Sequence, residues 1–272
     1  MDGWRTWDAP MGLAGYHWPA ADPRATVLLQ HGFGEHAGRY VGHFAGLVPA
    51  LVARGFDVHA FDLEGHGRSR GSRGVTDVGR MAEAHLVARR MLGGRPLFLF
   101  GHSLGGLVTA LSVARAPDGL AGVVLSGAAL PFGTRAVTRA FARAVATVAP
   151  GLGVAKLDAP SGLSRIGAEV EAYLADPLVF RRTIPARLGA TFLRAGAEVE
   201  RALGGWRAPT FAFHGLADTY TDPKGSERLV AGIASADKEL LLVPDGRHEL
   251  LNDLGREAML ARVLGWLEAR AR

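Results

Sequence analysis

Cysteine is absent from the 272-residue chain, and lysine nearly so. The absence of cysteine excludes disulfide bonds, thiol catalysis and zinc sites built on thiolates. Only three of the 31 basic residues are lysines, so arginine carries most of the positive charge. The arginines are scattered, and no run of them resembles a nucleic-acid-binding patch. We attribute the formal net charge of +5 to a compositional bias, although a basic surface also favours approach to anionic lipid.

Nor does the sequence contain a recognisable secretory signal or membrane-spanning segment. It begins MDGWRTWDAP, with an early acidic residue and without the apolar core of a secretory signal. No apolar run reaches the roughly eighteen residues that cross a bilayer. We therefore expect a soluble, cytoplasmic protein. Apolar residues at 48% and charged residues at 21% are typical of a folded chain with one large domain or two modest ones.

Short, continuously apolar runs recur along the chain and predict strands buried on both faces of a sheet. These runs span residues 26–30, 56–61, 96–100, 122–125, 210–213 and 239–243. Segments with helical character lie between them, at 40–54, 77–92, 104–114 and 256–271. The alternation predicts a doubly wound α/β fold, with a mostly parallel central sheet flanked by helices. In such folds the reactive groups gather at the carboxyl ends of the strands.

One long segment, from about residue 128 to residue 205, lacks a convincing strand. Within it, a stretch with helical spacing has one apolar face, formed by Val137, Phe141, Val145 and Val148. That face either packs on the core or belongs to a lid. We expect residues 1–127 and 206–272 to form the α/β core, and residues 128–205 to form a helical cap over the active site.

Two serines match the pattern G-x-S-x-G, which in a nucleophile elbow exposes a serine on a strained turn between a strand and a helix. Ser69 is followed by RGSRG, which is too polar and too rich in glycine to begin a buried helix. Ser103 follows the apolar strand LFLF and precedes LGGLVTALSVA, a plausible buried helix. We therefore predict that Ser103 is the nucleophile and that Ser69 is a loop residue.

A serine nucleophile needs a histidine to take its proton and an acid to orient that histidine. In this architecture the partners follow in the order serine, acid, histidine, which leaves His214 and His248 as candidates for the base. His214 ends a strand, a position typical of structural histidines. His248 lies on a turn just past the last strand, in VPDGRHELL, where it can reach over the serine. His248 is the predicted base.

The orienting acid is expected in the loop HGLADTYTD, which follows the strand at 210–213. Asp218 is our first choice. Asp222 in the same loop is the alternative, although an aspartate before Pro223 also suits a helix cap. Asp245 is a more distant alternative.

Ester hydrolysis also needs hydrogen-bond donors for the oxyanion of the tetrahedral intermediate. The segment LLQHGFGEH ends the first long strand with small residues, so we expect the backbone N–H groups of Phe33 and Leu104 to form the oxyanion hole. Two rival interpretations of this segment fit less well. Its glycines miss the spacing of a dinucleotide fingerprint by one residue, and His31, Glu35 and His36 lack the helical histidine pair of a metal site. Neither a metal nor an organic cofactor is expected.

These motifs resemble those of the monoacylglycerol lipases and lysophospholipases, within the α/β-hydrolase superfamily. The resemblance extends from about residue 27 to residue 271 and is carried by HGFGEHAGRY, FDLEGHGRSRG, GHSLGG, EVEAYLADPLV, HGLAD and DGRHELLND. It implies the same triad that the residues themselves indicate, formed by Ser103, Asp218 and His248.

The resemblance further implies that polar side chains recognise a glycerol head group. The matching residues are Arg39, Glu169 and Tyr173, and we expect His102, beside the nucleophile, to line the same pocket. Glu169 and Tyr173 are four residues apart, so on a helix they share a face. The alternatives are a solvated glutamate, a tyrosine packed in the core and a structural ion pair for Arg39. The chain departs from the family at Phe33, where a small or aliphatic residue is usual, and we expect this ring to narrow the acyl entrance.

Together these features predict a serine hydrolase that cleaves carboxylic esters, foremost monoacylglycerols to glycerol and free fatty acid. A general carboxylesterase, a lysophospholipase and an acyltransferase on the same triad are the alternatives among enzymes. A non-catalytic protein that binds a lipid or another small ligand is the alternative of another class. The expected partner is a lipid-like ester rather than a nucleic acid, and transient contact of the cap with lipid surfaces is a hypothesis. No oligomeric state is predicted.

Overall fold

The computed structural model describes residues 3–271, and an eight-stranded sheet forms its centre. The strands of this sheet are β1 (Arg5–Asp8), β2 (Ala14–Trp18), β3 (Ala25–Gln30), β4 (Phe56–Phe61), β5 (Leu97–His102), β6 (Gly122–Ser126), β9 (Thr210–Gly215) and β10 (Lys238–Val243). Their order is β1-β2-β4-β3-β5-β6-β9-β10. β2 pairs in antiparallel fashion with both β1 and β4, and every other neighbouring pair in this sheet is parallel. The predicted mostly parallel sheet is confirmed.

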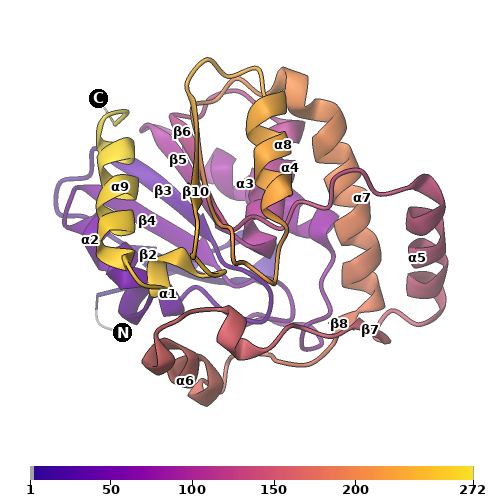
Figure 1. Cartoon of the computed structure of the whole chain (residues 1–272). Coiled ribbons are helices and arrows are strands. Elements are labelled where there is room, and N and C mark those ends of the chain that lie inside the picture. The colour runs from indigo at the N-terminus through magenta and orange to yellow at the C-terminus, as the bar shows by residue number, and fades with distance from the viewer. Residues whose placement is uncertain (1–2, 272) are drawn as a thin grey trace.

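Helices cover both faces of this sheet (Figure 1). On one face lie α3 (Val78–Met91), α4 (Leu104–Arg115), α7 (Ala186–Ala202) and α8 (Pro223–Gly232); on the other lie α1 (Arg39–Gly42), α2 (Leu47–Val52) and α9 (Arg256–Glu268). In β3, Leu28 packs in the first of these apolar layers, whereas Val27 and Leu29 pack in the second. Because both faces are buried, the strands are apolar at successive positions rather than at alternate ones.

The helix predicted at residues 40–54 is broken, and that prediction is wrong in detail. Phe44 and Ala45, which lie between α1 and α2, both have a φ of 54°. The Phe44 ring stacks on Tyr40 with their centroids 4.1 Å apart, and its N–H donates to Asn252 Oδ1. The chain therefore bends so that this ring enters the core, while the apolar pattern that suggested one helix continues across the break.

Between β6 and β9 the chain forms α5 (Ala136–Val148), β7 (Gly153–Ala155), α6 (Gly167–Ala175), β8 (Ile184–Pro185) and then α7. The expectation that this segment contains no strand is wrong, because β7 and β8 pair in antiparallel fashion. Each of these strands is too short to produce a recognisable apolar pattern. The limits of a cap at residues 128–205 stay a prediction.

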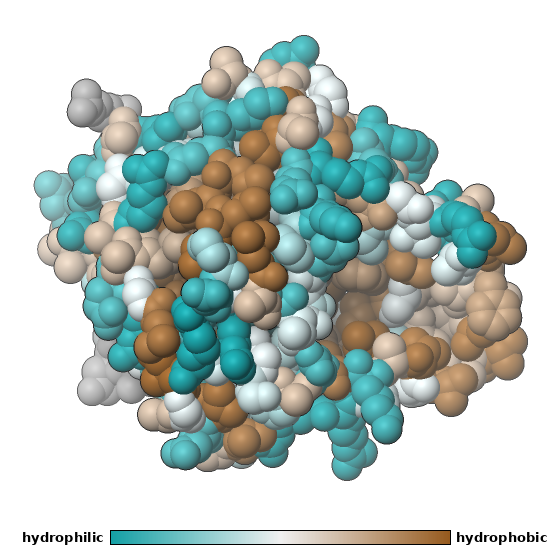
Figure 2. All heavy atoms as spheres, viewed as in Figure 1, coloured by the Kyte–Doolittle hydropathy of each residue, from teal (hydrophilic) through white to brown (hydrophobic). Residues whose placement is uncertain are grey.

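The first and last helices of this segment pack differently. Leu188 and Val199 of α7 are buried in the same apolar cluster as α3 and α4. α5 packs against α7 but has no buried residue, and Val137, Phe141 and Val148 are 68%, 72% and 87% exposed. The apolar face of α5 therefore does not pack on the core, and Figure 2 shows apolar atoms at the edge where Figure 1 places α5. Within residues 3–271, no helix is both long and apolar enough to cross a membrane.

Candidate active site

Ser103 lies on the turn between β5 and α4, with φ of 53° and ψ of −120°. This conformation is rare for a residue with a side chain and stores strain of roughly 1–3 kcal/mol. The glycines around it allow close packing. A Cβ on Gly105 would lie 2.2 Å from the Gln30 carbonyl oxygen, and one on Gly101 would lie 2.6 Å from Thr109 Oγ1. The turn thus has the strained geometry that the sequence pattern predicts.

Ser69, the other serine in a matching pattern, has a structural environment. Its Oγ donates to the Asp62 carbonyl at 2.6 Å and accepts from the Ala14 N–H at 2.9 Å. The Asp62 carboxylate is itself fully buried and accepts from Tyr16 Oη at 2.7 Å. Ser69 therefore joins β2 to the loop after β4, as expected of a loop residue.

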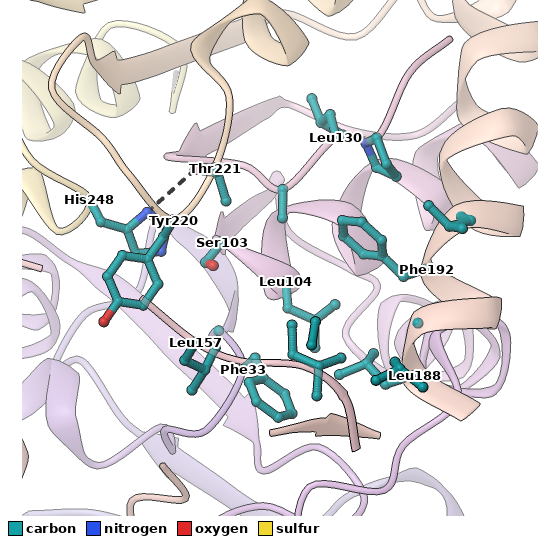
Figure 3. A pocket seen from close by; sticks show the side chains of 18 of the residues that line it. Phe33, Ser103, Leu104, Leu130, Leu157, Leu188, Phe192, Tyr220, Thr221 and His248 are labelled. Atoms are coloured by element: carbon teal, nitrogen blue, oxygen red, sulfur yellow. Dashed lines mark hydrogen bonds between the residues drawn. The ribbon is translucent and has the colours of Figure 1, made fainter. Parts of the chain in front are cut away.

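Ser103 opens into a cavity of about 550 Å³ between the sheet and the segment from α5 to α7. Figure 2 shows the surface hollowed beside this segment, and Figure 3 shows the cavity itself. Ser103 and His248 both line this cavity and lie on the same side of it (Figure 3). Most of the wall is apolar and includes Phe33, Leu104, Leu130, Leu157, Leu188 and Phe192. The polar residues of the lining include His102, Glu35, Arg39, Glu249, Tyr173 and Tyr220.

The Asp218 carboxylate holds His248 and is held in turn by its own loop. His248 Nδ1 donates to Asp218 Oδ2 at 2.8 Å, which leaves Nε2 available to another group. The same Oδ2 accepts from Thr221 Oγ1 at 2.7 Å and from His214 Nε2 at 3.1 Å. Oδ1 accepts the N–H of Tyr220 at 2.7 Å. His214 therefore has a supporting position beside Asp218, not beside the serine.

Charge and burial shift the pKa values of both Asp218 and His248. Burial alone would raise the pKa of Asp218, but the His248 charge and the hydrogen bonds from His214 and His248 outweigh it and hold that pKa far below its ordinary value. Burial alone would lower the pKa of His248, but the Asp218 carboxylate outweighs it and raises that pKa above the ordinary value. The aspartate is ionised at neutral pH, and the histidine is a stronger base than an isolated one.

His102 adjoins His248 but is not suited to exchange protons near neutral pH. Its ring centroid lies 4.9 Å from that of His248, and its Nδ1 lies 3.0 Å from the Ser126 carbonyl oxygen. Burial and the neighbouring His248 lower the pKa of His102 to about 3, so this ring stays neutral. His102 lines the cavity, in the position expected for it.

The loop that carries Phe33 is fixed on both sides of this residue. The Gly32 N–H donates to Glu35 Oε1 at 2.6 Å, and the Gly34 carbonyl accepts the N–H of Phe180 at 2.7 Å. The N–H groups of Phe33 and Leu104 have no acceptor within the part of the chain that the structure describes. Two backbone donors next to the Ser103 turn are therefore available to a ligand.

Arg39 lies in a buried charge cluster with Glu35 and Glu249. Its Nη1 donates to Glu35 Oε2 at 2.7 Å, and its Nη1 and Nη2 donate to the two oxygens of Glu249 at 2.9 and 3.0 Å. The guanidinium lies between the rings of Phe44 and Tyr173, about 5 Å from each centroid. Arg39 thus joins the loop that carries Phe33 to the residue that follows His248.

Glu169 and Tyr173 do not face the same site, although both lie on α6. Tyr173 lines the cavity, whereas Glu169 is not part of its lining. Glu169 Oε2 accepts from His43 Nδ1 at 2.7 Å, and its Oε1 accepts from Arg256 Nη1 at 2.6 Å. Four residues advance a helix by about 6 Å, which is enough to place the glutamate against the core elements instead. The structure therefore contradicts the placement of Glu169 in the pocket.

Sequence reasoning missed Glu249, Thr221 and Tyr220. The available signals were that Thr221 and Tyr220 share the loop of Asp218 and that Glu249 is an acidic residue next to His248. The structure adds that Glu249 is buried. Neither of the other two candidate acids bonds to His248 within residues 3–271, although Asp222 also lines the cavity. Asp222 caps α8 and accepts from the Lys224 N–H, and Asp245 is exposed. Within residues 3–271, no group of three or more His, Cys, Asp or Glu could hold a metal ion.

A mostly parallel sheet that presents a serine between β5 and α4, beside a histidine–aspartate pair, is the arrangement of the α/β serine hydrolases. The family model described as serine aminopeptidase, S33 matches residues 21–255, and the chain belongs to this family.

Relatives of this chain include named lipases. It is 34% identical over 256 residues to a monoacylglycerol lipase of Mycolicibacterium smegmatis, covering 92% of this chain and 90% of that one. It is 33% identical over 252 residues to a monoglyceride lipase of Homo sapiens, covering 88% and 80%. The crystal structure of a monoacylglycerol lipase from Paleococcus ferrophilus matches with a TM-score of 0.85 and 34% identity, covering 96% and 100%. These similarities identify the chain as a carboxylic ester hydrolase.

Proposed function

We propose that this protein hydrolyses monoacylglycerols to glycerol and fatty acid through an acyl-enzyme intermediate. The observation that carries the proposal is one cavity that joins a strained Ser103 turn and the His248–Asp218 pair to a long apolar wall. A volume of about 550 Å³ suits an aliphatic chain with a small head group. The lipases among the relatives support the same substrate class.

In the proposed reaction, Ser103 Oγ attacks the ester carbonyl and its proton passes to His248 Nε2. The carbonyl oxygen becomes an oxyanion that accepts from the free N–H groups of Phe33 and Leu104. His248 Nε2 then gives its proton to the departing glycerol oxygen, which leaves an ester of Ser103. Water repeats the two steps, releases the fatty acid and restores the serine. Asp218 stays ionised throughout and stabilises the imidazolium.

For the glycerol head group, the polar part of the cavity lining offers a binding region. Arg39 directs its donors to Glu35 and Glu249, so we assign it the role of holding those two carboxylates in place. Tyr173 of α6 and the two carboxylates line the cavity and can bond glycerol hydroxyls. An apolar wall at one part and polar groups at another suit an ester that is itself amphipathic.

Relative kcat/KM values test the substrate class. We expect a mid-chain monoacylglycerol to be cleaved at least about tenfold better than a lysophosphatidylcholine with the same acyl chain, because the buried Glu35 and Glu249 disfavour an anionic phosphate. A short p-nitrophenyl ester serves as the reference for the serine chemistry. If the protein cleaves only the p-nitrophenyl ester, it is a general carboxylesterase and the proposed monoacylglycerol substrate is wrong.

We also propose that the exposed face of α5 makes transient contact with lipid surfaces. Phe141 belongs both to the cavity lining and to the exposed face, whereas Val148 is 87% exposed and outside the lining. Val148→Asp is therefore expected to reduce activity on micellar substrate while leaving hydrolysis of a dissolved short ester unchanged. Phe141→Asp is expected to reduce the micellar activity as well. Wild-type micellar rates in both variants would contradict this contact.

A further inference from the structure

The imidazole of His248 lies between two other rings. The Tyr220 ring stacks on it with centroids 5.0 Å apart and an angle of 14° between the planes, and His102 lies 4.9 Å away on a tilted plane. Figure 3 shows the Tyr220 ring beside His248, on the side of the cavity that holds Ser103. The bond from Nδ1 to Asp218 fixes one atom of the imidazole, but by itself leaves the ring able to swing about that bond. A ring stacked in parallel restricts such swinging.

Tyr220 is itself fixed from two directions. Its N–H donates to Asp218 Oδ1 at 2.7 Å, so its backbone belongs to the same loop as the acid. Its hydroxyl donates to the carbonyl oxygens of Asp158 and Ala159, at 2.9 and 3.2 Å, in the segment between β7 and α6. The ring is therefore held at its backbone end by the core and at its hydroxyl end by the predicted cap.

The segment between β7 and α6 also lies close to both Tyr220 and His248 at Gly162. A Cβ at Gly162 would lie 3.1 Å from Tyr220 Cε2 and 2.5 Å from Thr219 Oγ1, so only glycine allows this approach without displacement. The Gly162 carbonyl oxygen also accepts the N–H of His248 at 3.3 Å. Tyr220, Gly162 and His248 thus form one contact between the predicted cap and the base.

We propose that Tyr220 is a positioning residue for His248. The aromatic face of Tyr220 holds the imidazole in the plane that reaches Ser103, and it stabilises the imidazolium as that cation forms. The inference rests on the proposed function, which makes His248 the general base. An aromatic face attracts a cation placed over it, and a small misplacement of a catalytic group lowers the rate strongly. The bond from the Tyr220 N–H to Asp218 holds the residue beside the imidazole, and the hydroxyl bonds to the cap carbonyls add a second, weaker attachment.

Two substitutions separate the ring from the hydroxyl. Tyr220→Leu removes the aromatic face, whereas Tyr220→Phe keeps it and removes the bonds to Asp158 and Ala159. With a short p-nitrophenyl ester, we expect Tyr220→Leu to lower kcat by about tenfold with KM within twofold, and Tyr220→Phe to stay within about threefold of wild type. The rate at which a fluorophosphonate labels the serine should fall in the same order, because labelling needs the base but no deacylation.

The unfolding midpoint of each variant is measured first, and Tyr220→Met replaces Tyr220→Leu if the leucine variant does not fold. A wild-type kcat without the aromatic face, or an equal loss in Tyr220→Phe, would overturn the positioning role. Ser103→Ala in the same assay separates this outcome from a failure of the proposed function. If Ser103→Ala retains the wild-type rate, the triad is wrong and the role of Tyr220 is overturned with it.

Discussion

Replacing Arg39 with methionine tests the buried charge cluster beside the candidate site. The side chains of Arg39, Glu35 and Glu249 are only 3–4% exposed, and Arg39 donates to both carboxylates. Methionine fills a similar space without charge, so Arg39→Met leaves two buried carboxylates facing each other. Removing one partner of a buried ion pair typically costs about 3–5 kcal/mol.

The direction of the shift in the pKa of Glu249 agrees with this expectation. Burial alone would raise this pKa, but the Arg39 charge outweighs burial and lowers it to about 2 from an ordinary value of 4.5. The ionised form of Glu249 is therefore favoured in the folded chain over the unfolded one, which contributes stability. Because the pKa is lower in the folded state, this stability is present above about pH 4.5 and is lost as the pH falls towards 2.

We therefore expect Arg39→Met to lower the free energy of unfolding in urea by about 3–5 kcal/mol at pH 7. The difference from wild type should narrow as the pH falls from 7, because burial raises the pKa values of the unpaired carboxylates, which then take up protons above pH 4.5 in the folded variant. Below about pH 4.5 the wild type also loses the contribution of Glu249, so the difference narrows further. Arg54→Met is the matched control, because Arg54 pairs with Glu268 at the surface and is 43% exposed; its loss should stay under about 1 kcal/mol. Equal losses in the two variants, or a difference independent of pH, would refute the reasoning.

Three further predictions concern the elbow and the histidine–aspartate pair. The kcat/KM for a soluble ester should fall as the pH is lowered, with an apparent pKa above 6.5. The reason is that His248 must be neutral to act as a base and that its pKa is raised. An apparent pKa below 6.5 would contradict this prediction. Asp218→Asn should lower kcat by about 10³–10⁴-fold in the same assay with folding retained, and a loss under about tenfold would exclude it as the orienting acid. Gly105→Ala should prevent stable folding, because the added Cβ clashes with the Gln30 carbonyl oxygen. Gly265→Ala in α9 is the control, because nothing lies within 4 Å of an added Cβ there; it should raise the unfolding free energy by up to about 1 kcal/mol.

The parallel core was predictable because its strands are apolar on both faces. The strand at 56–61 was predicted with the limits that β4 has, and that at 96–100 differs from β5 only at its ends. β1 and β2 were both missed; the side chains of β1, including Arg5 and Asp8, are mostly exposed and polar. Such an edge strand is specified by its partner β2 rather than by its own composition.

The chain order and motif context pointed to Ser103, Asp218 and His248 because those residues follow individual strands. The supporting contacts could not be predicted in the same way, since they join segments distant in the sequence. Arg39 and Glu249 are separated by 210 positions, and no local pattern relates them. Tyr220 is similar, because its stacking on His248 depends on how two loops pack. Contacts of this kind arise only from the tertiary fold.

Hydrolysis of a mid-chain monoacylglycerol by wild type, Ser103→Ala and Ser69→Ala tests the central claim most directly. Both serines match the same five-residue pattern, but only Ser103 lies on the strained turn at the cavity. We predict rapid release of fatty acid by wild type, a loss of at least about 10³-fold in Ser103→Ala, and a rate close to wild type in Ser69→Ala. Equal activity in wild type and Ser103→Ala, or no cleavage of the glyceride by wild type, would contradict the account.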